Sequence, residues 1–240
     1  MGVMRRNYFQ IGDVSSLDFG IVISDASVWG SPKRVFESVS VPGRNGDLIF
    51  DEGRYENAPI DYNCQILNDG GELDRFRAWL ASQVGYVRLE DTYHPEEYRL
   101  AAVSSGLTPQ MTLWALRRGD FNVTFSAKPQ RFLKIGDVGT EYESNISIYN
   151  PTYFEARPII RVYGYGDLVV GGVTVSIESN SLSYIDIDSQ VDDCYCGTTN
   201  ANQYITLSGD SFPTLAVGVT NIELPATVSK IILFPKWFTM

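Results

Sequence analysis

The sequence lacks the features that mark membrane-spanning or secreted chains. No apolar run reaches the roughly 18 residues that a transmembrane helix requires, so membrane insertion is not expected. The N-terminus, MGVMRRNYFQ, carries two arginines but no apolar stretch follows, so a secretory signal is not expected either. The three cysteines, Cys64, Cys194 and Cys196, are an odd number, which fits folding in a reducing cytoplasm.

Residues and motifs typical of catalysis are also scarce. His94 is the only histidine, and neither a Gly-x-Ser-x-Gly elbow nor a Gly-Lys-Ser/Thr loop occurs. Without a recognisable nucleophile nearby, His94 is best interpreted as a histidine of a surface loop. Paired carboxylates could hydrolyse glycosidic bonds only if the fold set them on opposite sides of a sugar. We therefore expect no enzyme, no catalytic residue and no cofactor. The carboxylates considered are Glu96, Glu97, Asp192 and Asp193.

No segment carries a complete set of metal ligands. Cys194 and Cys196 would share one face of a strand, but a zinc site needs four ligands and His94 is about a hundred residues away. Asp186, Asp188, Asp192 and Asp193 loosely resemble a calcium loop that lacks its turn glycine and closing glutamate. The alternation in Tyr184-Ile-Asp-Ile-Asp188 instead predicts a strand whose acidic residues face solvent. No metal is expected.

The chain is acidic, and its charge is uneven. The formal net charge is −10; residues 1–134 hold 15 Lys and Arg against 17 Asp and Glu, and residues 135–240 hold 4 against 12. Affinity for nucleic acid comes mainly from cations, so sequence-specific binding of nucleic acid is not expected. An acidic wall would instead repel DNA, which is useful where DNA must slide past.

Composition and turn residues predict a mainly β fold. Aromatic residues reach 12% of the chain, and they favour strands. Residues 17–62 consist of short β-prone runs separated by turns. Pro42-Gly43 and Asn45-Gly46 lie within five residues, and Asn-Gly between β-prone runs is a strong hairpin signal.

One helix is predicted between Asp69-Gly-Gly-Glu72 and Gly85, with acidic residues near its start and a glycine as its stop. Its apolar stripe has spacings of three and four and is typical of core packing rather than of a cofactor site. The stripe consists of Leu73, Phe76, Leu80 and Val84, and Trp79 widens it.

The chain is expected to form two domains, at 1–134 and 135–240. Between Lys128-Pro129 and Gly139 the charge balance changes and helical signals stop. Just before this point, Arg118-Gly119-Asp120 is interpreted as a hairpin turn rather than as an adhesion motif. Beyond it, short β-prone runs separated by turns continue to Phe234 and predict an antiparallel sandwich.

Several segments, in order, resemble siphophage distal tail proteins. Gly20-Ile21 begins a strand, and the run Ser38-Val-Ser-Val-Pro-Gly-Arg-Asn-Gly-Asp-Leu48 is the most specific match. Tyr55-Glu-Asn57 follows, and Asn150–Pro158 resembles the entry to the C-terminal domain of that family. The terminal Phe234-Pro-Lys-Trp237 completes a resemblance that covers nearly the whole chain.

The resemblance implies an N-terminal tail-tube-related β-sandwich or barrel-like domain with one helix, and a galectin-like C-terminal β-sandwich. It implies a structural role, in which a homo-hexameric ring forms a hub with a lumen for DNA. The implied partners are the tail tube protein and a tail-associated lysin, tail fibre or receptor-binding protein. Such a protein would be made in the cytoplasm of the bacterial host and would reside at the virion tail tip, in the baseplate.

The hairpin signal supplies the candidate interface residues. A rigid bend would present Arg44 to a carboxylate of a neighbouring copy, although an ordinary hairpin with a solvated arginine explains the glycines equally well. An alternative function is carbohydrate binding by the C-terminal sandwich, with Tyr163, Tyr165, Tyr195 and Tyr204 stacking on sugars, but these rings could equally belong to the core or to an interface. The interface candidates are Val41, Pro42, Gly43, Arg44, Asn45, Gly46 and Tyr55, and the helix-packing candidates are Leu73, Phe76, Trp79 and Leu80.

Overall fold

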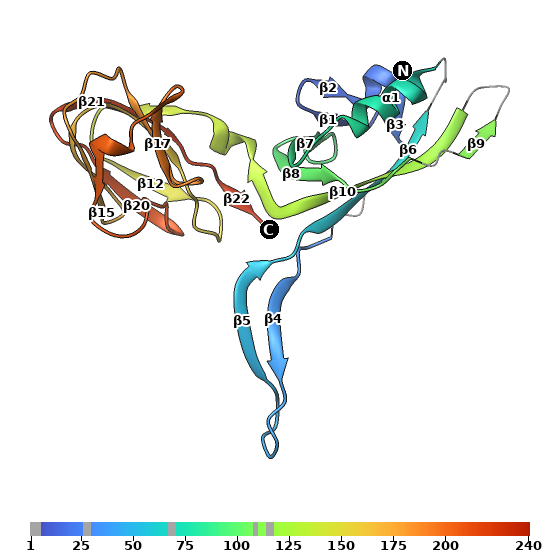
Figure 1. Cartoon of the computed structure of the whole chain (residues 1–240), viewed down its shortest axis with the longest axis horizontal. Coiled ribbons are helices and arrows are strands. Elements are labelled where there is room, and N and C mark those ends of the chain that lie inside the picture. The colour runs from blue at the N-terminus through green and yellow to red at the C-terminus, as the bar shows by residue number, and fades with distance from the viewer. Residues whose placement is uncertain (1–5, 26–29, 67–70, 108–109, 114–117) are drawn as a thin grey trace. The chain divides into compact units, whose positions relative to one another are not determined.

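The computed structural model describes residues 6–25, 30–66, 71–107, 110–113 and 118–240. It confirms the mainly β class and divides the chain into two compact units (Figure 1). The first unit extends to Arg131 and includes Met240, and the second comprises Phe132–Thr239. The division falls inside one long strand, β10 (Arg118–Leu133). No helix among the described residues is long and apolar enough to cross a membrane.

A curled sheet forms the body of the first unit. The strand order is β2-β1-β7-β8-β10-β6-β3, and β9 also pairs with β10. An antiparallel bridge joins Asn7, just before β1, to Ile23 in β3, so the two ends of the sheet meet around one core. The other strands of this sheet are β1 (Phe9–Ile11), β2 (Val14–Ser15), β3 (Ile21–Ile23), β6 (Ala58–Ile66), β7 (Val87–Asp91), β8 (Glu97–Val103) and β9 (Gln110–Leu113), and the 3-10 helix η1 (Ser16–Phe19) precedes β3.

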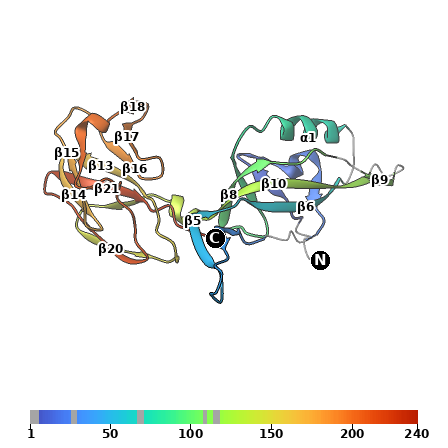
Figure 2. The same cartoon turned by 60° about the horizontal axis from the view of Figure 1, so that its bottom comes forward.

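One α-helix is present in the described part of the chain, α1 (Glu72–Ala81), and it lies over the sheet (Figure 2). Every second residue of β6 is buried, because alternate side chains of a strand point to opposite faces. Leu73, Phe76 and Leu80 of the helix are buried in the same core, and Trp79 packs beside them against Phe9.

The prediction that Val84 belongs to the apolar stripe of the helix is wrong. The helix ends at Ala81, so Val84 lies beyond it and is 88% exposed. The side-chain hydroxyl of Ser82 and the side-chain amide of Gln83 both donate to the carbonyl of Trp79, which also accepts the backbone amide of Ser82 at 3.2 Å, and these bonds satisfy the carbonyl end of the helix.

The prediction that Arg118-Gly119-Asp120 forms a turn is also wrong. All three residues belong to β10, where Arg118 pairs with Leu113 and Asp120 with Gln110 of β9. On its other side Asp120 pairs with Gln65 of β6, whose side-chain amide donates to the Asp120 carboxylate at 2.9 Å. Pairing on both sides fixes this segment as extended backbone.

The second unit is the expected antiparallel β-sandwich. One sheet has the order β11-β21-β13-β16-β17-β18, the other β12-β20-β14-β15-β19, and apolar side chains of both form one core. Short 3-10 helices η3 (Lys134–Asp137) and η4 (Asn202–Tyr204) lie in the connections. The strands of the two sheets are β11 (Thr140–Tyr142), β12 (Ile146–Asn150), β13 (Ile159–Gly164), β14 (Gly166–Val170), β15 (Val173–Ile177), β16 (Ile185–Asp188), β17 (Asp193–Cys196), β18 (Thr199–Asn200), β19 (Ile205–Leu207), β20 (Gly218–Glu223) and β21 (Val228–Phe234). The short strand β22 (Phe238–Thr239) belongs to neither of these sheets and pairs with β10.

A close backbone approach makes Gly164 a sensitive position of the sandwich. Its φ is +133°, and a Cβ added there would lie 2.3 Å from the Thr227 carbonyl oxygen. Gly164→Ala is therefore expected to destabilise the second unit by about 2–4 kcal/mol, because backbone must shift and a left-handed conformation must carry a side chain. The loss of stability would be measured from the amide exchange rates of β13 in the native protein and from the midpoint of thermal unfolding. Gly209→Ala, where nothing lies within 4 Å, should change little; equal effects of the two would contradict the explanation.

Candidate functional site

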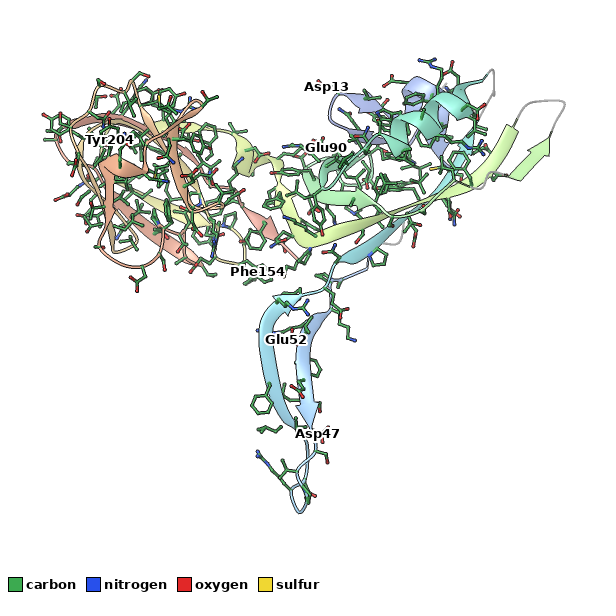
Figure 3. All side chains as sticks on the ribbon, viewed as in Figure 1. Asp13, Asp47, Glu52, Glu90, Phe154 and Tyr204 are labelled. Atoms are coloured by element: carbon green, nitrogen blue, oxygen red, sulfur yellow. The ribbon has the colours of Figure 1, made fainter. Side chains whose placement is uncertain are left out.

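The sequence-predicted interface residues all lie in one hairpin, β4 (Arg34–Val39) and β5 (Leu48–Tyr55). Its two strands pair only with each other and form a sheet separate from the curled sheet. The last cross-strand pair is Val39 with Leu48, so eight residues connect the strands, more than the two of a tight Asn-Gly turn. Figure 3 shows Asp47 near the tip and Glu52 nearer the base. Residues 41–46 are in the connection, and Tyr55 is the last residue of β5.

Two glycines shape the connection. Gly43 and Gly46 have φ of +80° and +82°, a region that side chains other than glycine seldom adopt. The Arg44 amide donates to the Val41 carbonyl at 3.2 Å, which closes a turn over Pro42 and Gly43. The hydroxyl of Ser38 donates to the Asp47 carboxylate at 2.7 Å and joins the two ends of the connection.

Arg34 fastens the base of the hairpin. Its Nε donates to the Asp51 carboxylate at 2.7 Å, Nη1 donates to the Tyr55 hydroxyl at 3.1 Å, and the guanidinium lies over the Tyr55 ring. The hydrogen bond from Arg34 lowers the pKa of Asp51, and the hydrogen bond to Asp51 raises the pKa of Arg34. Through these contacts Tyr55 helps to hold the register between β4 and β5.

The hairpin exposes apolar side chains on both faces, a feature that the sequence analysis did not identify. Cross-strand partners share a face, so Val39, Leu48 and Phe50 lie on one and Phe36 and Ile49 on the other. Ile49 and Phe50 are each 54% exposed. An isolated two-stranded hairpin is only marginally stable in water, and exposed apolar clusters mark interaction surfaces. The hairpin therefore has the character of a docking element. The run Leu48-Ile-Phe50 could have revealed this feature in the sequence, because three consecutive apolar residues of a strand place apolar side chains on both of its faces.

Arg44 is available to a partner. Among the described residues no carboxylate forms an ion pair with it, whereas Arg34 and Arg54 of the same hairpin are paired with Asp51 and Glu52. A guanidinium on a rigid bend can bind a carboxylate through two parallel hydrogen bonds.

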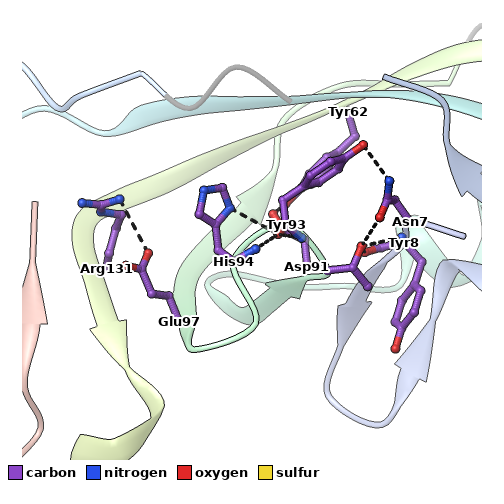
Figure 4. Close-up of polar contacts among 9 residues, drawn as sticks. Asn7, Tyr8, Tyr62, Asp91, Tyr93, His94, Glu97 and Arg131 are labelled. Atoms are coloured by element: carbon purple, nitrogen blue, oxygen red, sulfur yellow. Dashed lines mark hydrogen bonds and ion pairs between the residues drawn. The ribbon is translucent and has the colours of Figure 1, made fainter. Parts of the chain in front are cut away.

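His94 belongs to a polar cluster that supports the turn between β7 and β8 (Figure 4). The buried Asp91 carboxylate accepts from the Tyr62 hydroxyl at 2.8 Å and from the amides of Tyr93 and His94 at 2.9 and 2.8 Å. His94 Nδ1 lies 3.3 Å from the same carboxylate. Burial first, and the Asp91 charge next, raise the pKa of Tyr62 well above its usual value. These contacts are structural, and among the described residues no cysteine or serine side chain hydrogen-bonds to His94.

The four carboxylates considered for catalysis are divided between the two units. Glu97 lies 3.6 Å from Arg131 in the first unit, and Glu96 is exposed beside it. In the second unit Asp192 faces Arg157 at 3.7 Å, and the Asp193 side chain accepts from the Cys194 amide and from Asn202. No described group of three or more His, Cys, Asp and Glu side chains is arranged to hold a metal ion.

The expectation that Asp186 and Asp188 face solvent is wrong. Both are buried, because side chains from the neighbouring strands β13 and β17 lie against their carboxylates. Arg161 of β13 binds Asp186 through Nε at 2.7 Å and Nη2 at 2.9 Å, and the Tyr195 hydroxyl donates to Asp188 at 3.1 Å. Apolar and acidic residues do alternate along β16, but side chains cover both faces of this strand, so its acidic face is buried as well.

Burial makes two of the three cysteines unreactive. It raises the pKa of Cys64 and of Cys194 to about 12, so only about one thiol in 10⁴ is ionised at pH 8. Cys196 is partly exposed. Titration of the native protein with a disulfide reagent is expected to find one rapidly reacting thiol per chain, and three in denaturant. Cys196→Ser should remove the rapid reaction, and a rapid reaction that persists in that variant would contradict this assignment.

Only one of the four tyrosines proposed for sugar stacking is well exposed. Tyr165 is exposed, whereas Tyr163 packs on Tyr184, Tyr195 is bound to Asp188, and Tyr204 packs against the core. The most exposed rings of the second unit, Tyr149 and Tyr153, were missed by the sequence analysis.

Comparison with known proteins shows which solved structures have a similar fold. No family model matches the chain, and no curated protein matches it. Among solved structures, the SPP1 Dit protein, described as a paradigm of the hub adsorption apparatus in phages infecting Gram-positive bacteria, superposes with a TM-score of 0.71 at 10% identity over 98% of this chain and 100% of that chain. A chain of the activated phage p2 baseplate with Sr gives 0.50 at 12% identity over 97% of both chains. The resemblance to siphophage distal tail proteins is thus confirmed at the level of the fold: this chain has the architecture of a phage tail hub protein.

Proposed function

We propose that this chain is a structural, non-catalytic hub protein of a siphophage tail tip. Six copies close into a ring that joins the tail tube to the baseplate and the host-adsorption proteins, and DNA passes through the lumen. The observation that carries the proposal is the β4–β5 hairpin, whose exposed apolar faces suit contact with another copy, on a chain that shares the architecture of the SPP1 hub protein.

The chemistry of the hairpin fits a head-to-tail contact between copies. In such a ring the hairpin of one copy lies against a different surface of the next, and rotation closes the assembly. Phe36, Ile49 and Phe50 would supply apolar burial, and Arg44 would bind a carboxylate of the neighbouring copy. The net charge of −10 would keep DNA from adhering as it passes.

The non-catalytic part of the proposal rests on the described side chains. The single histidine is bound to a buried carboxylate, and the candidate carboxylates are either ion-paired, hydrogen-bonded or isolated on the surface. The expected residence at the virion tail tip and assembly in the host cytoplasm follow from the same hub role.

The decisive experiment is the mass and shape of the assembly. Light scattering after size exclusion is expected to give about 161 kDa, six times the 26.8 kDa chain, with open rings in negative-stain images of the same peak. If the isolated chain is monomeric, antibody labelling of intact virions decides: label at the tail tip supports the hub role, and its absence there rejects it.

A further inference from the structure

The second unit carries a groove lined by residues of the end strands of its two sheets. The groove encloses about 290 Å³. Its sides are formed by β11, through Thr140 and Tyr142, and by β12, through Ser147–Tyr149, and the side chain of Leu233 and the Trp237 side chain lie among its lining residues. β11 and β12 are the end strands of their sheets, so the groove lies between two strand edges.

Exposed apolar side chains surround this groove. Ile135 is 70% exposed and Tyr149 69%, and Val138 between them along the lining is also exposed. Tyr149 pairs across the strands with Val219, which is 62% exposed, so the apolar surface continues onto β20. Contiguous apolar surface of this kind is uncommon on soluble proteins unless it binds a partner.

The strand edges define the conformation of the partner. Among the described residues, β12 pairs only with β20, so the backbone groups on its outer side have no strand partner. An extended segment can add to such an edge by main-chain hydrogen bonds while alternate side chains enter an adjoining pocket. A helix satisfies its own backbone groups and would leave that edge unpaired.

Charge defines the chemistry of the partner and excludes a second copy. Glu143, which follows the lining residue Tyr142, is exposed, whereas Lys230 and Lys236 are already paired with Glu141 and Asp137 at 2.9 Å. Residues 135–240 carry 4 Lys and Arg against 12 Asp and Glu, so two such units repel each other. An extended segment with basic residues beside its apolar ones complements this surface.

We propose that the groove between β11 and β12 binds an extended apolar segment with basic flanks, supplied by another protein, as an added strand on the outer edge of β12. The interaction goes beyond ring formation and does not require it, because every residue involved belongs to the second unit of a single chain.

Selection from a displayed library of random ten-residue peptides tests this. The whole chain is the target, and Tyr149→Ser is the counter-target. Enriched peptides are expected to alternate apolar residues between Lys or Arg, to bind Tyr149→Ser about ten-fold more weakly, and to slow amide exchange in β12. Tyr165→Ser, which removes another exposed tyrosine away from the groove, should bind them as the unchanged protein does.

Four results would overturn the proposal. The first two are a selection that enriches nothing and a selection that enriches peptides binding Tyr149→Ser equally well. The third is binding that survives N-methylation of the peptide backbone, which would exclude strand addition. Binding of N-acetylglucosamine oligomers that Tyr149→Ser abolishes, without peptide enrichment, would assign the groove to a glycan instead. None of these results depends on whether the chain forms rings, so they are distinguishable from failure of the hub role.

Discussion

Replacing Phe36 and Phe50 by serine is expected to abolish the ring while leaving each chain folded. The two rings lie on opposite faces of the β4–β5 hairpin, are half exposed, and belong to neither core. Complete burial of an exposed side chain of this size contributes roughly 1.5–3 kcal/mol; because both rings are already half buried, losing the two weakens each contact between copies by about 1.5–3 kcal/mol. That is roughly a 10- to 10²-fold loss of affinity at every interface, repeated around the ring. Light scattering would show monomer where the unchanged protein shows the ring mass.

A matched surface variant separates this effect from a general loss of solubility. Val191 is 66% exposed in the turn between β16 and β17, and Val191→Ser should leave the ring mass unchanged. Amide exchange of β6 and β10 should be the same in all three proteins, because the hairpin contributes nothing to the first core. Rings that persist in the double serine variant would remove the hairpin from the proposed interface.

Arg44 provides a second, smaller comparison at the same element. Arg44→Ala would remove a cation that has no ion-pair partner among the described residues, whereas Arg54→Ala removes one already paired with Glu52 at 2.9 Å. A larger effect of the former on ring mass would show that Arg44 contacts a neighbouring copy. Equal effects would favour the solvated-arginine interpretation that the turn chemistry also allows.

The sequence predicted those parts of the fold that depend on neighbouring residues. Gly43 and Gly46 indicated a bend that the structure places between β4 and β5, since positive φ is a local requirement. The spacing of Leu73, Phe76 and Leu80 predicted the helix, because one apolar face is needed wherever a helix covers a sheet. The order of segments resembled the siphophage distal tail proteins, and the chain shares the fold of the SPP1 Dit protein.

The errors arose where burial depends on distant parts of the chain. Asp186 is enclosed because Arg161, twenty-five residues earlier, neutralises it from the next strand. Arg118-Gly-Asp120 is extended because two strands pair with it. The groove beside Tyr149 exists because two sheet edges separate at that point, which no local pattern encodes. Periodicity shows which residues share a face, but not whether another element covers that face.

Removing the carboxylate of Asp91 is expected to cause the largest loss of stability in the first unit. The Asp91 side chain is fully buried and accepts one hydroxyl and two backbone donors. Nearby Arg99 is buried too; burial and then Arg131 lower its pKa to about 10, while the charges of Glu97 and Asp91 act in the opposite direction. Asp91→Ala would leave these donors without an acceptor, and it should cost about 3–5 kcal/mol.

The slowest-exchanging amides of β6 would measure the free energy of unfolding of this unit, independently of the second. Tyr62→Phe removes only one of the three donors and leaves Asp91 bound to both amides, so a loss of about 1 kcal/mol is expected. Asp13→Ala, at an exposed turn, should change nothing measurable. If Asp91→Ala lowered the free energy of unfolding no more than Tyr62→Phe does, the backbone amides of the β7–β8 turn would have to donate to water in place of the carboxylate. The turn would then be held by the strand pairing of β7 with β8 rather than by the buried carboxylate.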